Sequence, residues 1–296
     1  MRGFCGGMPM SREIFTTVAA LACLLGLAAG PPALADDSDD DATLEEVMAA
    51  RKRYDRFQVA LGNYLTNFDT EVALDPSGGG SGTQINLEDV LGLSKQENVF
   101  RIDGYWRFNL KHRIAFGYYG ISRDAFGGVD EEFTFGDTTV TVDADVKTVF
   151  DAPVMGAAYQ YAMVNTPKIE SGVTVGLSAL DFKTSLEITD NVAMTTAEEE
   201  ASGVIPLLVV GYYSSVTIKP KWFFDYSLAF FGGSYGDYSG SVVDARISSS
   251  YYPVKHFGFG GAYSIYRIDV DVETTDFGGS LNYYNRGFNM FLIFGF

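Results

Sequence analysis

The chain has 296 residues, of which 47% are hydrophobic, 15% aromatic and only 20% charged, and its formal net charge is −17. The apolar content excludes a disordered chain, and the acidic balance argues against binding nucleic acid, which relies on Lys and Arg to neutralise phosphates. A bundle of membrane helices is excluded as well. Each such helix needs about 20 nearly continuous apolar residues, whereas the apolar residues here mostly alternate with polar ones.

The one continuous apolar run lies at the N-terminus and has the organisation of a secretory signal. Arginines precede an apolar stretch at residues 14–29, and a small-residue motif ends at Ala35. This order is typical of a signal peptide. We therefore predict that residues 1–35 are removed on export by cleavage between Ala35 and Asp36. Both cysteines of the chain lie in this segment, so the mature chain is expected to have no disulfide and no cysteine metal site.

Residues 36–56 are predicted to be an acidic tail followed by a short periplasmic helix. Residues 36–41 are mostly acidic, and residues 42–56 are rich in helix-forming side chains. Thr43 and Glu46 have the spacing of a capping box, in which each side chain bonds to a backbone N–H at the start of a helix.

From residue 57 to residue 296 the hydrophobic pattern has a period of two. For example, Trp106 and Phe108 fall on one face of a predicted strand and Arg107 on the other. Short basic turns divide this region, and longer stretches rich in Gly and acidic residues lie between them. Dividing the chain at these turns gives five segments, each with room for two tilted strands, and so about ten strands, within a range of 8 to 12.

These features predict an all-β fold, a transmembrane antiparallel up-and-down β-barrel formed by residues 57–296. In lipid every backbone N–H and C=O must be paired within the protein, so a sheet can cross only if it closes on itself. Short turns on one side and long loops on the other are typical of barrels in outer membranes.

The last strand carries apolar residues at every second position and ends in an aromatic residue. Its outward set is Phe288, Met290, Leu292, Phe294 and Phe296. Here the chain resembles the Gram-negative outer-membrane β-barrel proteins. The resemblance implies a location in the cell outer membrane, contact with outer-membrane lipid and lipopolysaccharide, and recognition of the closing strand by the barrel-assembly machinery.

Candidate catalytic residues are few and badly placed for chemistry. His112 and His256 fall in the short turns, and Ser234 lies in a G-x-S-x-G pattern without the strand-to-helix turn that a nucleophile elbow requires. We therefore expect no enzyme activity, no cofactor and no metal site. The long loops are rich in acidic residues, so divalent cations could bridge them to lipopolysaccharide phosphates.

Charged residues on the polar face of the strands are predicted to line the lumen. They are Arg101, Asp103, Arg107, Arg113, Arg123, Asp225, Asp244, Arg246 and Arg286. They could line a water channel, or they could pair with one another and block a narrow barrel. Eight strands leave an interior that side chains just fill, whereas 16 to 18 leave an aqueous channel. Ten strands lie near the filled end, which favours a blocked lumen.

The expected function is accordingly a passive structural or surface role in the outer membrane. One alternative is a narrow channel or transporter for small or hydrophobic solutes. A second alternative is a surface adhesin or receptor, or a lipid-modifying barrel enzyme.

Overall fold

The computed structural model describes residues 56–76, 80–142, 144–166, 168–190, 195–235, 238–254, 256–273 and 278–296, all within one compact unit of the chain. The predicted signal peptide, its cleavage site, the acidic tail and all of the predicted helix at residues 42–56 except its last residue lie outside these described residues. No helix long and apolar enough to cross a membrane occurs among the described residues.

The described residues form strands connected by turns and loops. The strands are β1 (Phe57–Leu74), β2 (Ile85–Asn86), β3 (Gln96–Asn109), β4 (His112–Tyr119), β5 (Ser122–Gly128), β6 (Phe133–Phe135), β7 (Thr138–Val140), β8 (Asp145–Asp151), β9 (Val154–Asn165), β10 (Ile169–Asp190), β11 (Thr195–Lys219), β12 (Trp222–Tyr235), β13 (Tyr238–Val254), β14 (Phe257–Glu273) and β15 (Gly278–Gly295).

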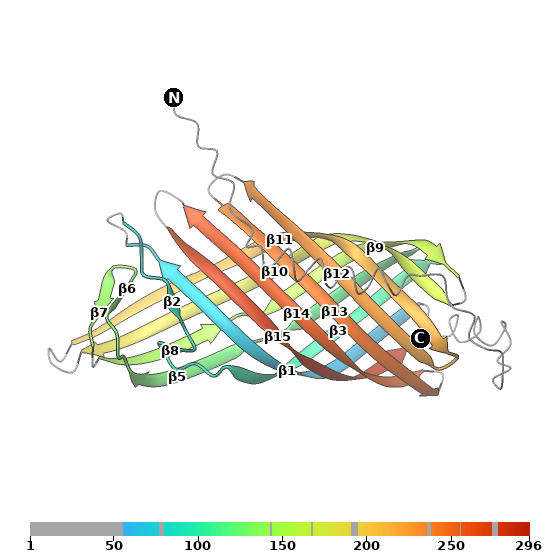
Figure 1. Cartoon of the computed structure of the whole chain (residues 1–296), viewed down its shortest axis with the longest axis horizontal. Helices are drawn as coiled ribbons and strands as arrows, with labels where there is room; N and C mark the ends of the chain where they lie inside the picture. The colour runs from blue at the N-terminus through green and yellow to red at the C-terminus, as the bar shows by residue number, and fades with distance from the viewer. Residues whose placement is uncertain are drawn as a thin grey trace, which may run out of the picture. The chain divides into compact units, whose positions relative to one another are not determined.

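Antiparallel pairing closes the sheet into a ring, which Figure 1 shows from the side. The pairs run from β1 through β3, β4 and β9 to β10, then through β11, β12, β13, β14 and β15 back to β1. The last contact joins the first strand, β1, to the last strand, β15. Phe57 N donates to Phe296 O at 3.0 Å and Phe296 N donates to Phe57 O at 2.8 Å. Every strand in the ring therefore has a partner on both sides, as a sheet in lipid requires.

The structure divides the wall into more strands than the predicted number of about ten. Two long strands of the wall are each divided in two, at Gly120–Ile121 between β4 and β5 and at Ala152–Pro153 between β8 and β9. Proline has no N–H to donate to a ladder, yet Ala152 N still bonds to Ile121 O at 2.9 Å across the break. The short strands β2, β6 and β7 lie outside the ring of pairs.

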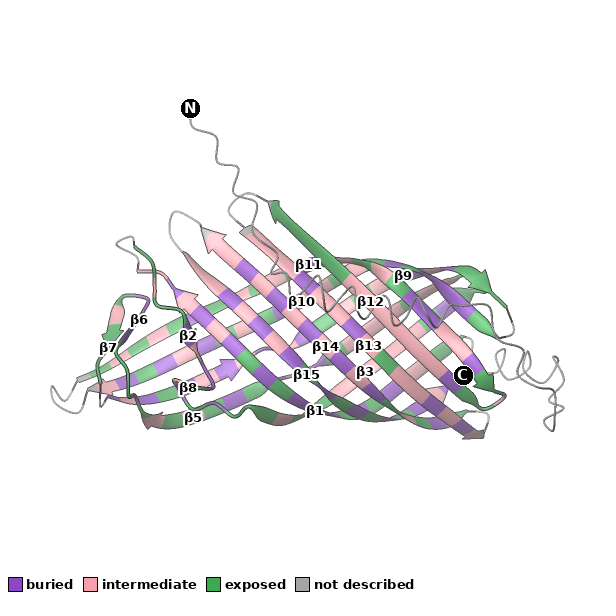
Figure 2. Ribbon diagram, in the orientation of Figure 1, coloured by how far each residue is buried: buried purple, intermediate pink, exposed green. Residues whose placement is uncertain are grey.

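Burial alternates regularly along much of β1 and β15, as Figure 2 shows. On β15 the outward Phe288 and Met290 are 63% and 71% exposed, whereas the inward Asn289 and Phe291 are 1% and 8% exposed. Successive side chains of a strand point to opposite faces. The barrel therefore presents an apolar outer surface and a mixed polar and apolar lumen.

Candidate functional site: the barrel lumen

The lumen contains three layers between the end with the short turns, which also holds the C-terminus, and the opposite end with the long loops. We call these the short-turn end and the long-loop end. A polar cavity lies toward the short-turn end, a layer of charges and tyrosines follows, and an apolar cluster fills the lumen toward the long-loop end.

The polar cavity has a volume of about 270 Å³ and is partly enclosed. On one side of it Glu170 of β10 receives two arginines. Arg107 Nη2 lies 2.7 Å from Glu170 Oε2, and Arg113 Nη1 lies 3.1 Å from Oε1. The Arg113 guanidinium is held between two rings, 4.8 Å from the centroid of Tyr105 and 4.2 Å from that of Tyr213. These contacts fix the arginines in place around the cavity.

A second ion-pair cluster crosses the barrel at the cavity, which Asp103 and Arg246 also line. Asp103 Oδ2 of β3 lies 2.9 Å from Arg101 Nε on the same strand and 2.9 Å from Arg246 Nη1 of β13. The strands β14, β15 and β1 separate β13 from β3 in the ring. The Arg246–Asp103 pair therefore joins two distant parts of the wall through the lumen.

A layer of buried tyrosines lies next to this cluster. Asn285 accepts a hydrogen bond from the Tyr64 hydroxyl at 2.9 Å and donates to the Tyr283 hydroxyl at 2.9 Å. Tyr119 and Tyr266 pack edge to face with ring centroids 6.1 Å apart. Tyr64, Tyr283 and Asn285 are all 0% exposed, so this layer contains tightly packed, hydrogen-bonded groups.

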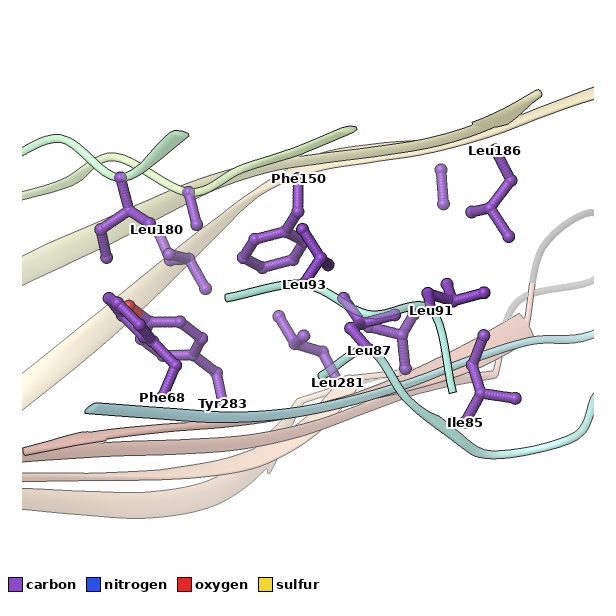
Figure 3. Packing of buried hydrophobic residues seen from close by; sticks show 14 of the residues in the cluster. Phe68, Ile85, Leu87, Leu91, Leu93, Phe150, Leu180, Leu186, Leu281 and Tyr283 are labelled. Atoms are coloured by element: carbon purple, nitrogen blue, oxygen red, sulfur yellow. The ribbon is translucent and has the colours of Figure 1, made fainter. Parts of the chain in front are cut away.

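The apolar cluster contains a segment of chain that has left the wall. β2 pairs with β1 only at residues 71 and 72, and the chain then turns inward. Figure 3 shows Leu87, Leu91 and Leu93 lying between the two facing sides of the barrel. They are 0%, 5% and 2% exposed. We call residues 87–95 the inner segment.

One buried ion pair anchors the inner segment. Glu88 pairs with Arg123 of β5, and their side chains are 1% and 0% exposed. Arg123 also donates to Thr70 Oγ1 at 2.8 Å, and Thr70 N donates to Glu88 Oε2 at 2.8 Å. The guanidinium lies over the Phe68 ring at 4.4 Å. A charged pair with this many partners is positioned in one geometry.

The charges predicted to line the lumen divide unequally in the structure. Eight of them point inward, namely Arg101, Asp103, Arg107, Arg113, Arg123, Asp225, Asp244 and Arg246. Arg286 does not. It is exposed on the same face as Phe288, and its guanidinium lies 5.9 Å from the Tyr284 ring on the outside of the barrel. Residues two apart on a strand share a face, so Phe288 and Arg286 cannot point in opposite directions.

Sequence reasoning did not assign a role to Glu88. It lies in a loop stretch outside the strand pattern, so strand parity says nothing about its direction. The available signal was the spacing of Leu87, Leu91 and Leu93, which gives a polar loop an apolar face.

The predicted assembly signal lies on the outer face of β15. Phe288, Met290, Leu292 and Phe296 are 63%, 71%, 48% and 64% exposed, and Phe294 is half-buried. The neighbouring Phe57 and His256 pack around the chain end, and the His256 ring stacks on the Phe296 ring with centroids 5.8 Å apart.

The candidate catalytic residues lie apart from one another. His112 Nδ1 contacts the Tyr159 hydroxyl at 2.5 Å and His256 Nδ1 lies 2.7 Å from Gly295 O, both near short turns. Ser234 lies at the other end of β12, opposite Ser239. In the part of the chain that the structure describes, no three His, Cys, Asp or Glu side chains form a group that could hold a metal ion.

Comparison with solved structures decides the type of barrel. The outer-membrane protease OmpT of Escherichia coli matches with a TM-score of 0.50 and 10% identity, over 82% of this chain and 97% of OmpT. The chain has the fold of an outer-membrane β-barrel. Ail of Yersinia pestis matches more weakly, with a TM-score of 0.30 and 8% identity, over 79% of this chain and 99% of Ail. The toluene transporter TodX of Pseudomonas putida matches with a TM-score of 0.29 and 10% identity, over 82% of this chain and 90% of TodX.

Two further comparisons gave no match. No model of a known protein family matches the chain, and no curated protein sequence matches it.

Proposed function

We propose that this outer-membrane barrel resides in the cell outer membrane with a lumen closed by its own side chains, and that its role there is structural or at the surface. The observation that supports this role is the apolar cluster around the inner segment. It includes Phe68, Phe150, Leu180 and Tyr283 from the wall, with exposures between 0% and 5%. We expect such close packing to leave no continuous water path through that layer.

The physical consequence is a high barrier to ions. An ion that enters an apolar layer loses its hydration without receiving a counter-charge, and the buried charges of this region are already engaged in the Glu88–Arg123 pair. The barrel should therefore contribute a stable wall and exposed loops to the membrane and pass no ions in its resting form.

A narrow channel remains the second candidate, and the inner segment is the observation that favours it. Apart from the two-residue strand β2 and the Glu88–Arg123 pair, the segment is tied to the wall by a small number of hydrogen bonds, among them Leu87 N to Thr70 O and Phe68 N to Lys95 O, both at 2.9 Å. Its departure would leave a lumen lined by apolar side chains toward the long-loop end and by polar ones toward the short-turn end, which suits small or hydrophobic solutes.

We also propose that the barrel is not an enzyme. A serine nucleophile needs a general base within hydrogen-bond reach. Ser234 lies at the long-loop end of β12, whereas His112 and His256 bond to groups near the short turns. Replacing Ser234 and both histidines should leave the lipid and surface-protein profiles of the cells unchanged, and an altered profile would make catalysis the better proposal.

Planar-bilayer conductance tests the closed lumen. The wild-type barrel should show no stepwise current, whereas a variant with Leu87, Leu91 and Leu93 all replaced by Ser should conduct, because water can then enter the apolar layer. The matched control is Asp89→Ala, which breaks the exposed Lys95–Asp89 pair of the same segment and should stay silent. Steady current through the wild-type barrel would replace the closed barrel with the channel.

A further inference from the structure

The polar cavity at the short-turn end has a balanced set of charges. Its lining includes three arginines, Arg107, Arg113 and Arg246, and three carboxylates, Asp103, Glu170 and Asp225. The cavity is therefore formally neutral, although it is lined by six charged groups. A ligand with one net charge would disturb this balance in a partly desolvated site, whereas a ligand with one charge of each sign would not.

The pairing within this set is uneven. Glu170 takes Arg107 and Arg113, and Asp103 takes Arg246 together with Arg101. Asp225 forms no ion pair with any residue that the structure describes. Its partner is the Ser215 hydroxyl, which lies opposite it on β11. The carboxylate of Asp225 is thus available to a cation that enters the cavity.

Two of the arginines retain unused hydrogen-bond donors beside Asp225. Arg113 donates from Nε to Gln160 and pairs with Glu170 through Nη1 by charge, without a hydrogen bond to Oε1. Arg246 donates from Nη1 to Asp103. A guanidinium has five N–H donors, so each can still bind a carboxylate. Arg113 and Arg246 are also the cations that act electrostatically on Asp225. The cavity therefore holds an open acceptor next to open donors.

The remaining walls suit a small organic molecule. Tyr213, Tyr226 and Phe223 supply ring surfaces, and Ser214 and Ser248 supply hydroxyl groups. A volume of about 270 Å³ lies at the lower end of the range for small-molecule sites, so an occupant the size of an amino acid fits and a sugar chain or a lipid does not.

We infer that this cavity is a binding site for a small zwitterion of amino-acid size, entered from the short-turn end. The ligand's ammonium group binds Asp225, and its carboxylate binds Arg113 and Arg246. Binding here does not require a path through the barrel, because the tyrosine layer and the apolar cluster lie beyond the cavity.

Isothermal titration calorimetry on the folded barrel in detergent tests this site with three related probes. They are L-leucine, 3-methylbutylamine, which is leucine without its carboxylate, and 4-methylpentanoate, which is leucine without its ammonium group; glycine and L-glutamine cover smaller and more polar side chains. At least one amino acid should bind, and the two single-charge analogues should bind at least about tenfold more weakly, because each lacks one of the two charged groups that the site binds.

Asp225→Asn should weaken binding of the amino acid at least about tenfold, because the substitution removes the charge while keeping the size and shape of the side chain. Asp244→Asn is the matched control, since Asp244 lies on the adjacent strand and is not part of the cavity lining; it should bind like the wild type. Heat-modifiable migration in gels confirms that both variants are folded.

Three results would overturn the site: no amino acid binds the wild type, the amine binds as well as the amino acid, or Asp225→Asn leaves binding intact. Conductance is measured separately. If the barrel conducts ions and binds leucine, only the closed-lumen proposal is wrong. If the barrel does not conduct and binds none of the probes, only the proposed zwitterion site is wrong.

Discussion

Glu88 and Arg123 form an ion pair inside the barrel, with side chains that are 1% and 0% exposed. Glu88 belongs to the inner segment and Arg123 to β5 in the wall, so this contact holds the inner segment against the wall. The same carboxylate also accepts the backbone N–H of Thr70, which draws β1 into the same site.

Removal of one partner of this pair should destabilise the barrel strongly. Glu88→Ala leaves an uncompensated guanidinium in an apolar layer, which costs on the order of 3–5 kcal/mol. Asp89→Ala, the control, breaks an exposed pair and should cost less than about 1 kcal/mol. Urea unfolding of the barrel in lipid vesicles measures both, and equal effects would show that Glu88 is solvated.

Asp103 should matter more for stability than Asp225. Asp103→Ala removes the partner of both Arg101 and Arg246, so a loss of about 3–5 kcal/mol is expected. Asp225→Asn removes no ion pair and keeps a polar group beside Ser215, and it should change stability by less than about 1 kcal/mol. Thermal melting of the two variants provides the comparison, and a reversed order would contradict the pairing described for the lumen.

The C-terminal residues should be required for assembly. Replacing Phe294 and Phe296 with Ser removes outward apolar surface worth about 1.5–3 kcal/mol per Phe, at the point where Phe296 pairs with Phe57. The chain should be exported but remain unfolded, as shown by loss of heat-modifiable migration. Phe230→Ser, at an outward residue that is 58% exposed, is the control and should still assemble. A correctly inserted double variant would overturn the role of the closing strand.

The orientation of the barrel can be tested with single cysteines, since the only native cysteines lie in the predicted signal peptide. A membrane-impermeant maleimide on intact cells should label Gly80→Cys and Glu198→Cys in the long-loop half. It should not label Lys111→Cys or Lys168→Cys in the short turns. Labelling of the short-turn positions alone would show that the barrel has the opposite orientation, with the polar cavity at the cell surface.

The period-two pattern was enough to predict most of the wall. It assigned Trp106 and Phe108 to the outer face and Arg107 to the lumen, because a strand offers each side chain only two directions. Arg286 was the exception. Its charge suggested the lumen, but strand parity, read from Phe288, places it outside, and parity is the stronger constraint.

The inner arrangement could not be predicted in this way. Ion-pair partners such as Arg246 and Asp103, or Glu88 and Arg123, lie on elements far apart in the sequence, and their contact depends on how the ring closes. Asp225 has the same inward parity as its paired neighbours yet forms no ion pair with any residue that the structure describes, and only the positions of the surrounding side chains reveal this.

The sequence by itself therefore determined the alternating wall, the aromatic closing strand and the apolar outer surface, because these properties depend on local periodicity. The tertiary structure alone decided that residues 87–95 lie inside the lumen and that Glu170 and Asp103 each pair with two arginines. It also decided that Asp225 faces a cavity with no ion-pair partner among the described residues. Side chains from distant strands meet only after the sheet has closed, so their contacts leave no periodic signal along the chain.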